Sequence, residues 1–590
     1  MIKKIYLSDI IKKQAVLNVG CIGHVSNGKS TLVRQMTGIK TQKFKSEKER
    51  NCTINVGYGN CKIFYNEESE EYKFRGSAAE KEIDSKGNDM QLIHHISFVD
   101  CPGHENYMSN MLCGTSVIDM AFLLEAANAE NVPQPQTLEH FLAIQNTNID
   151  DIVVIQNKCD LVKKNEILAN KSLIEDFIDD VTDDKLPIIP LVAQTGKNVE
   201  YVGKYLSNKL INYKKDINLP LQINIIRTFD VNKPNTLIDN FKGGVLGGSI
   251  VQGLLKIGDI LQVSPGICKR NSDNTWTVTP LFTKVVSINS EKNSMEYAIP
   301  GGLIGIGTFL DPAYTKANKL TGQIVTTPGE NLHIASRIKI KYSSFRRIEK
   351  ISKTLHKNET VKVGIICNHV TGKIYKWDKK TKTIIIDLGI PCCVNNQVVS
   401  IMKKIDKTYK IFSIGRIIEY KSVTVNVPEE YKNQDKVSYE IVNDVSVNKE
   451  VECFDYETML DKLGNQVVKK KKIKLINPVI SKTKNGSQQI INNFQEIIEN
   501  ISNTNDKVDI SYLFEKKISD ELSCPVNKND KGKLLIHGKV KPPAIYNSII
   551  NTLCTTRKCK SCKGYNTFIK KDGRSLIMSC LECKSETTIS

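Results

Sequence analysis

The sequence predicts an α/β domain followed by two β-barrels, a small second α/β domain and a terminal metal-binding ribbon. Three observations predict this order. Segments typical of strands and helices alternate through residues 1–213, as a doubly wound sheet requires. From Leu219 onward, short alternating strands are interrupted by glycines, a pattern typical of closed β-barrels. The chain ends with two pairs of cysteines, which predicts a small module that binds a metal ion.

Composition narrows the class of protein. The net charge of +19 favours a polyanionic partner such as RNA, although a lysine-rich solvated surface is the alternative. No apolar run reaches about 18 residues, and the N-terminus lacks the apolar segment of a signal peptide. Most of the 17 cysteines lie singly within apolar segments, as in a reducing compartment. We therefore expect a cytoplasmic protein with no membrane partner.

A phosphate-binding loop is predicted near the N-terminus. Residues 23–30 read GHVSNGKS, the pattern G-x-x-x-x-G-K-S, between a predicted strand and a predicted helix. Backbone N–H groups of such a loop surround phosphates, Lys29 would reach the β- and γ-phosphates, and the Ser30 hydroxyl would bind Mg²⁺. The alternative is a chance Gly-Lys turn. The candidate phosphate-binding residues are Gly23, Ser26, Asn27, Gly28, Lys29, Ser30 and Thr31.

Three further motifs follow, each directly after a predicted strand. The first, DCPG, places Asp100 where a carboxylate can hold Mg²⁺ through water and Gly103 where a backbone N–H can meet the γ-phosphate. The second, NKCD, provides a carboxylate that can accept two hydrogen bonds from guanine. The third, Ala193-Gln194, could close the base pocket with a backbone N–H. The candidate base-binding residues are Asn157, Lys158, Asp160, Ala193 and Gln194. Four motifs in this order predict a guanine-nucleotide switch with GTP, GDP and Mg²⁺ as ligands.

The spacing of the C-terminal cysteines predicts a zinc site. Cys559 and Cys562 form one pair, Cys580 and Cys583 form the other, and 17 residues separate the pairs. This spacing fits a four-cysteine zinc ribbon, whereas a pair of redox dithiols would need a βαβ context that is missing. Basic and aromatic residues around the cysteines suit RNA contact. The alternative is a ribbon that docks on protein and carries a charged exterior.

Longer stretches of the sequence resemble one family of translation factors. From residue 16 to about 425 the chain resembles the gamma subunit of eukaryotic and archaeal translation initiation factor 2, in NVGCIGHVSNGKSTLVRQMTG, FKSEKERNCTINVGYGNCKIF, SFVDCPGHENYM, PQPQT, QNKCDLV, RTFDVNKPN, KGGVLGGSI and PGGLIGIGT. From about 453 to 584 it resembles the C-terminal part of the beta subunit, in FDYETMLDKL, GKLLIHGKV and CKSC…CLEC. The polypeptide therefore resembles a natural gamma–beta fusion.

The resemblance implies a domain order. It runs as a G domain at 1–213, β-barrels at 214–328 and 329–425, a linker at 426–487 with a docking helix at 453–463, an α/β domain at 488–553 and the zinc ribbon at 554–590.

The resemblance also implies function and residue roles. The chain would be a GTPase that delivers initiator methionyl-tRNA to the small ribosomal subunit and its mRNA. GTP hydrolysis would be the release switch, and its intrinsic rate would be slow. Thr53 in switch one would join Ser30 and Asp100 around Mg²⁺. His104 would position the attacking water, and Tyr58 would lie near the tRNA acceptor end. Their alternatives are a packed histidine and a plain strand tyrosine.

The sequence departs from the family pattern at several positions. Asn27 stands where the family usually has histidine, Glu125 falls in an apolar strand where the family places an aliphatic residue, and Val192 replaces a usual serine. The beta-like part lacks the lysine-block tail that recruits activating and exchange factors, and Lys469–Lys472 is one short basic run. An alpha subunit is a possible partner. Two rival functions stay open: an elongation-type carrier of another tRNA, and a mimic that sequesters tRNA or initiation partners.

Overall fold

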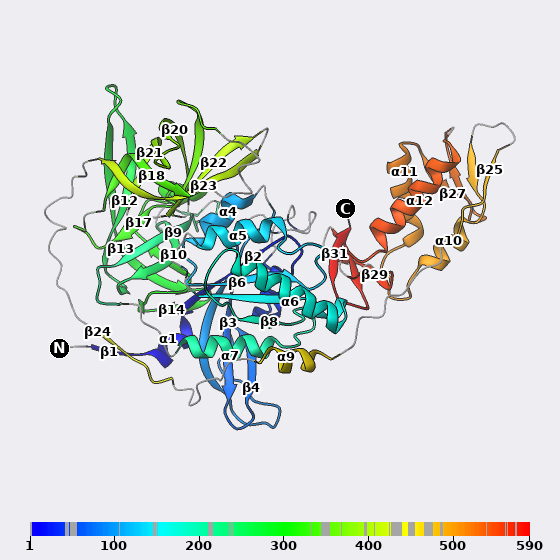
Figure 1. Cartoon of the computed structure of the whole chain (residues 1–590), viewed down its shortest axis with the longest axis horizontal. Coiled ribbons are helices and arrows are strands. Elements are labelled where there is room, and N and C mark those ends of the chain that lie inside the picture. Colours follow the sequence, from blue (N-terminus) through cyan, green and yellow to red (C-terminus); the bar gives the residue numbers. More distant parts are fainter. Residues whose placement is uncertain are drawn as a thin grey trace.

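The computed structural model of the chain has an N-terminal α/β unit, two β-barrels, a second α/β unit and a three-stranded C-terminal sheet (Figure 1). This architecture confirms the fold class expected from the sequence. No helix in the described part of the chain is long and apolar enough to cross a membrane. The predicted basic run at 469–472 lies outside the described residues. These are 3–589 without 42–46, 48–52, 54–55, 105–106, 146–148, 150, 211–215, 235, 238–239, 331, 344–353, 367, 395–397, 406–407, 424, 426–438, 446–454, 465–475, 484–487, 539, 561, 563 and 573–574.

A seven-stranded sheet with the order β4-β3-β5-β2-β6-β7-β8 forms the centre of the N-terminal unit. Strands β5, β2, β6, β7 and β8 are parallel, and the antiparallel pair β3 and β4 extends one edge. Two apolar clusters lie on its two faces, so the central strands are apolar along their length. The strands are β2 (Leu17–Gly23), β3 (Gly57–Asn66), β4 (Glu71–Gly76), β5 (Gln91–Asp100), β6 (Met120–Ala126), β7 (Asp151–Asn157) and β8 (Ile188–Pro190). The helices are α1 (Leu7–Lys13), α2 (Lys29–Thr37), α4 (Met108–Thr115), α5 (Pro135–Gln145), α6 (Lys164–Asp179) and α7 (Val199–Leu210).

Six strands close each barrel. The first ring runs β12-β17-β9-β10-β16-β13 and closes through the pairing of β13 with β12, and β14 extends β13 as a hairpin. The second ring runs β18-β21-β20-β19-β22-β23. Alternate residues point inward and fill each barrel with aliphatic side chains. The first barrel and its extensions comprise β9 (Gln222–Phe229), β10 (Val245–Gln252), β11 (Leu255–Lys256), β12 (Ile260–Arg270), β13 (Trp276–Ser290), β14 (Asn293–Met295), β15 (Tyr297–Ala298), β16 (Ile304–Thr308), α8 (Pro312–Thr315) and β17 (Ile324–Thr326). The second comprises β18 (Ile334–Ser343), β19 (Thr360–Ile365), β20 (Asn368–Asp378), β21 (Thr383–Cys393), β22 (Val398–Ile405) and β23 (Thr408–Ser422).

The chain after the second barrel returns to the N-terminal unit. Strand β24 (Tyr439–Val442) pairs in parallel with β1 (Lys3–Tyr6), a contact that the sequence did not predict. Ser8 then donates from its backbone N–H and its hydroxyl to the two carboxylate oxygens of Asp444, at 2.9 and 2.6 Å. These bonds hold the linker against α1, close to the N-terminus (Figure 1).

Helix α9 (Tyr456–Leu463) attaches the linker to the N-terminal unit, within the range where a docking helix was expected. Residues 453–454 of that range lie outside the described chain. Asp455 caps the helix, and its apolar face buries Met459, Leu460 and Leu463. The Asn198 amide donates to the Met459 carbonyl at 2.7 Å.

Shortening Leu460 to alanine is expected to weaken the docking of α9. The cavity left at this buried position costs about 2–4 kcal/mol of unfolding free energy, because surrounding side chains relax only in part. Limited proteolysis of the linker and urea denaturation measure the effect. The Lys462→Ala variant is the control, since its ion pair with Glu200 lies at the surface. Equal proteolysis rates in both variants would contradict the docking contact.

The C-terminal arm joins the second α/β unit to the ribbon through one apolar core. Arg557 is fully buried and donates to Asp506 and to the Thr567 carbonyl, while the Ile569 N–H also donates to Asp506. This paired buried charge fixes the ribbon on the α/β unit. The arm extends away from the barrels, with the ribbon nearest the N-terminal unit (Figure 1). Its elements are β25 (Ile480–Lys482), β26 (Gln489–Ile491), α10 (Phe494–Ile501), α11 (Ile510–Leu522), β27 (Val526–Lys528), β28 (Leu534–Ile536), α12 (Pro542–Thr556), β29 (Thr567–Asp572), β30 (Ser575–Cys580) and β31 (Glu586–Ile589).

Candidate functional site

The phosphate loop connects β2 to α2. Gly23 and Gly28 adopt φ angles of +132° and +96°, which favour glycine, and a Cβ on Gly23 would lie 2.3 Å from the Leu124 carbonyl oxygen. Lys29 begins α2 and folds back over the loop, where its Nζ donates to the Gly23 and His24 carbonyls at 2.8 and 2.7 Å. Burial lowers the pKa of Lys29 to about 8, while Asp100 raises it in part. The buried ammonium group of Lys29 therefore lies directly against the backbone of the phosphate loop.

Three predicted magnesium residues lie together beside this loop. The Ser30 and Thr53 hydroxyls are 3.0 Å apart, and Thr53 donates to Asp100 Oδ2 at 3.4 Å. Thr41 donates to the same oxygen at 2.5 Å. Asp100 Oδ1 is buried and has no hydrogen-bond partner among the described residues. Oxygen donors of this kind suit Mg²⁺, so the cluster can hold that ion.

Gly103 and His104 follow β5 but differ in position. Gly103 lies against the phosphate loop, where a Cβ would come 2.4 Å from Lys29 Nζ and 3.0 Å from Val25 N. His104 is half-buried beside Tyr107, with ring centroids 5.7 Å apart. It is not among the described residues that line the cavity.

The predicted base-binding residues meet at the other end of the loop. The Asn157 amide donates to the Asn27 carbonyl at 2.8 Å, and its oxygen accepts from the Ala193 N–H at 3.0 Å. Lys158 adopts a positive φ of 63°, and Asp160 follows in the short 3-10 turn Cys159–Leu161. Burial raises the pKa of Asp160. This network ties the phosphate loop to the two loops expected to recognise guanine.

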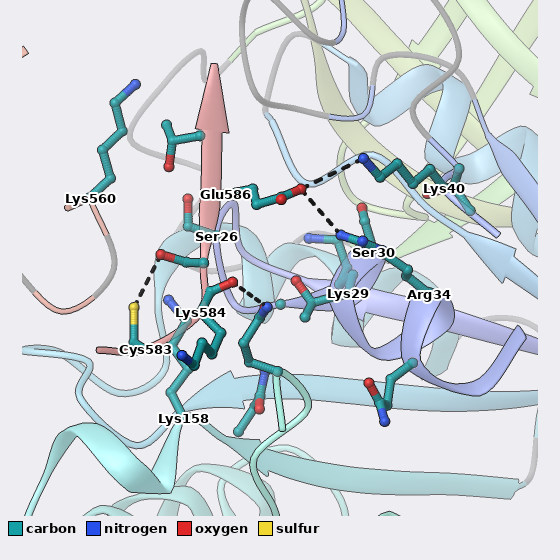
Figure 2. A pocket seen from close by; sticks show the side chains of 18 of the residues that line it. Ser26, Lys29, Ser30, Arg34, Lys40, Lys158, Lys560, Cys583, Lys584 and Glu586 are labelled. Carbon is teal, nitrogen blue, oxygen red and sulfur yellow. Dashed lines mark hydrogen bonds and ion pairs between the residues drawn. The ribbon is translucent and has the colours of Figure 1, made fainter. Parts of the chain in front are cut away.

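A cavity of about 510 Å³ lies between these loops and the ribbon. Figure 2 shows Lys560, Cys583, Lys584 and Glu586 of the ribbon facing Ser26, Lys29 and Lys158 across it. The predicted residues that line it are Ser26, Gly28, Lys29, Ser30, Thr31, Thr53, Gly103, Asn157, Lys158, Asp160 and Gln194. Gly23, Asn27, Asp100 and Ala193 lie behind this lining and support it.

The four cysteines of the ribbon form one cluster. The sulfur atoms of Cys559, Cys562, Cys580 and Cys583 all lie within 4.8 Å of one another, and all four residues are buried. Four converging thiols are the donor set of a structural zinc site. Leu161, next to Asp160, packs in the same apolar cluster as the four cysteines.

The contacts of the ribbon with the cavity were missed by the sequence analysis. Gln194 Nε2 donates to the Lys584 carbonyl at 2.6 Å. Arg34 and Lys40 each lie 3.6 Å from Glu586 across the cavity mouth (Figure 2). The one available signal was the charged exterior of the ribbon, which allowed a protein partner but did not say which surface.

Tyr58 lies where the N-terminal unit meets the first barrel. It is half-buried on β3, and the guanidinium carbon of Arg227 on β9 is 5.7 Å from its ring centroid. Arg227 also donates to the Val56 carbonyl at 3.2 Å. The predicted tRNA-contact residue is therefore part of an interface between domains.

Comparison with known proteins bears on the identity of the chain. Residues 14–231 match the family model described as the elongation factor Tu GTP-binding domain, and residues 464–586 match the domain found in initiation factors 2B and 5. Eukaryotic translation initiation factor 2 subunit 3 of Drosophila melanogaster is 36% identical over 436 residues, which cover 70% of this chain and 91% of that protein.

Two solved structures share the fold. The bacterial selenocysteine-specific elongation factor EF-Sec has a TM-score of 0.52 at 20% identity, covering 69% of this chain and 59% of that one. Elongation factor SelB from Methanococcus maripaludis, with a GTP analogue, has a TM-score of 0.50 at 21% identity, covering 70% and 80%.

The relative from Drosophila melanogaster and the two matching family models indicate the same family. The chain is a GTPase of the translation-factor type with a beta-subunit-like part in the same polypeptide, and it belongs to the family of the gamma subunit of translation initiation factor 2.

Proposed function

We propose that this GTP-dependent initiation factor binds initiator methionyl-tRNA in its GTP state and delivers it to the small ribosomal subunit and mRNA. Hydrolysis of GTP then releases the tRNA. The relative from Drosophila melanogaster supports the role in initiation. The geometry between the nucleotide site and the first barrel supports the coupling of nucleotide state to tRNA binding.

The residues of the cavity are assigned by their positions. Lys29 and the backbone of the phosphate loop hold the phosphates. The burial of Lys29 beside the Gly23 and His24 carbonyls supports this assignment. The Ser30 and Thr53 hydroxyls, which lie together with Asp100, would bind Mg²⁺, and Asp100 would hold it through water. The base-recognition residues are Asn157, Lys158, Asp160, Ala193 and Gln194. Mg²⁺ would supply positive charge where the β- and γ-phosphates meet.

The contact between Thr53 and the magnesium cluster carries this proposal. Thr53 precedes Val56 and Tyr58 by only a few residues, and both of these contact Arg227 of the first barrel. A γ-phosphate that fixes Thr53 would therefore fix the segment that packs against the barrel. Loss of the γ-phosphate frees Thr53, and the surface between domain and barrel changes.

His104 positions the attacking water in this proposal after a rearrangement. Its ring lies beside Tyr107, and His104 is not among the described residues that line the cavity, so we infer that it moves toward the γ-phosphate before hydrolysis. A slow intrinsic rate of hydrolysis is part of this proposal. Activating factors, exchange factors and an alpha subunit are candidate partners.

Binding of aminoacylated initiator tRNA tests the proposed function. Filter binding at fixed salt compares the GTP-analogue and GDP forms, because phosphate contacts make tRNA affinity strongly salt-dependent. Tighter binding in the GTP-analogue form, with preference over elongator tRNA, is expected. Equal binding in both forms would favour the mimic, and preference for an elongator tRNA would favour the elongation-type carrier.

A tyrosine variant locates the tRNA surface. We expect Tyr58→Ala to weaken tRNA binding and to leave GDP affinity unchanged. Tyr65→Ala on the same strand is the matched control, because Tyr65 packs on Tyr72 at 4.6 Å between ring centroids rather than on the barrel. Equal tRNA affinity in the two variants would argue against Tyr58 as a contact.

A further inference from the structure

Glu125 is a carboxyl group buried within an apolar parallel strand. All seven residues of β6 are buried, and Glu125 is 2% exposed. A strand covered on both faces normally carries aliphatic side chains, and an ionised carboxylate in such a place is costly unless it is paired. No salt bridge in the described part of the chain involves Glu125, and its Oε1 makes no hydrogen bond of normal geometry there, although Thr137 and the Gln134 backbone favour its ionised form. Packing alone therefore does not explain a carboxyl group at this position.

The contact of Glu125 with Asn27 leads into the phosphate loop. Asn27 Nδ2 donates to the Leu124 carbonyl at 2.9 Å and to Glu125 Oε2 at 3.4 Å. Both positions depart from the pattern of the family that the sequence resembles, and the fold places them against each other. The two departures thus form one local arrangement behind the loop.

Asn27 extends this arrangement to the base-recognition loops. Its carbonyl accepts from the Asn157 amide at 2.8 Å, and the Asn157 oxygen accepts from the Ala193 N–H at 3.0 Å. Glu125 therefore lies at one end of a series of contacts that runs through Asn27 to Asn157 and Ala193. The side chain of Asn27 is the link between β6 and that series.

Burial favours the neutral form of Glu125, whereas the groups around it favour the ionised form. Burial raises the pKa of Glu125 to about 7, while Thr137, the Gln134 backbone, Lys29 and Asn27 lower it in part. Lys29 faces it from α2, and burial brings the pKa of that lysine to about 8. His140 from α5 and His24 from the loop face the same region, and burial lowers the pKa of each. Glu125 thus exchanges its proton near neutral pH.

We propose that Glu125 is a positioning residue for nucleotide binding, whose carboxyl oxygen accepts the hydrogen bond from Asn27 and so aligns the phosphate loop with the guanine-recognition loops. Nucleotide phosphates add negative charge on the other side of the loop and disfavour an ionised Glu125. Nucleotide binding therefore takes up a proton at this carboxyl group. The affinity for nucleotide therefore falls as pH rises above about 7, because an ionised Glu125 must be protonated before the nucleotide can bind.

The pH dependence of GDP affinity in the full chain tests this proposal. A fluorescent GDP is titrated with Mg²⁺ between pH 6 and pH 8.5 into wild type, Glu125→Gln and Glu125→Leu. Glu130→Gln, at an exposed position in the loop after β6, is the matched control. Thermal melting of each variant reports whether it is folded. Titration of the nucleotide itself is common to all four proteins and cancels in their comparison.

Each variant has a distinct expected result. Wild type and Glu130→Gln should lose about tenfold in affinity between pH 6 and pH 8 beyond any change seen in Glu125→Gln. Glu125→Gln should match wild type at pH 6, since its amide imitates the neutral acid. Glu125→Leu should bind about fivefold more weakly at pH 6, as expected for one lost hydrogen bond to Asn27. Identical pH profiles for wild type and Glu125→Gln, or wild-type affinity of Glu125→Leu at pH 6, would overturn the proposal.

Discussion

Replacing Lys29 by alanine is expected to abolish nucleotide binding at micromolar concentration. The ammonium group is buried and donates to two loop carbonyls in the position where it would meet phosphates. Loss of a buried, hydrogen-bonded charge partner typically costs about 2–5 kcal/mol, or roughly 30- to 5,000-fold in affinity. Titration with fluorescent GDP and with a GTP analogue measures the change.

The control for Lys29→Ala tests whether the loss of any lysine charge weakens nucleotide binding, or only the loss of the lysine in the phosphate loop. Lys12→Ala removes a lysine whose side chain is exposed and pairs with Asp9 on its own helix. This variant should bind both nucleotides as wild type does. Thermal melting should show both variants folded. GDP affinity of Lys29→Ala within threefold of wild type would exclude the assigned role of the phosphate loop.

Removing one cysteine of the ribbon is expected to release zinc and to accelerate GDP dissociation. Cys562→Ser leaves three thiolates, and structural zinc ribbons lose their fold when the metal is lost. The ribbon covers the cavity through Leu161, Gln194 and the ion pairs to Glu586. These contacts together are worth about 1–2 kcal/mol, so dissociation should accelerate about tenfold.

Zinc content and dissociation kinetics must be measured on the same preparations. Cys554→Ser is the matched control, because Cys554 lies on α12 outside the four-cysteine cluster. It should retain one zinc ion per chain and the wild-type rate of GDP dissociation. Zinc loss without faster dissociation would show that the ribbon does not close the cavity in solution. Full zinc content in Cys562→Ser would contradict the metal site itself.

The local motifs were predictable because each depends on contiguous residues. Gly23 and Gly28 need positive φ angles, and Lys29 follows at the start of a helix, so the loop conformation is encoded within a few positions. The spacing of Cys559 and Cys562 likewise indicates a metal-binding turn before any fold is known. Alternation of apolar residues predicted the barrels for the same local reason.

The contacts that join distant segments could not be predicted in this way. Strand β1 pairs with β24 across more than four hundred residues, and no pattern within either strand selects that partner. His104 follows the DCPG motif, and only the fold shows that its ring lies beside Tyr107. Glu125 had no explanation in the sequence, because Asn27 becomes its neighbour only when β6 lies beside β2.

The sequence by itself determined the fold class, the order of the nucleotide motifs and the four cysteine ligands, because short-range backbone geometry and ligand spacing specify them. Only the tertiary structure placed the ribbon over the nucleotide cavity and Glu125 behind the phosphate loop. Such placements depend on which buried surfaces and charges fit together across the whole chain. This complementarity exists only in the packed molecule, so it cannot be read from any one segment of the sequence.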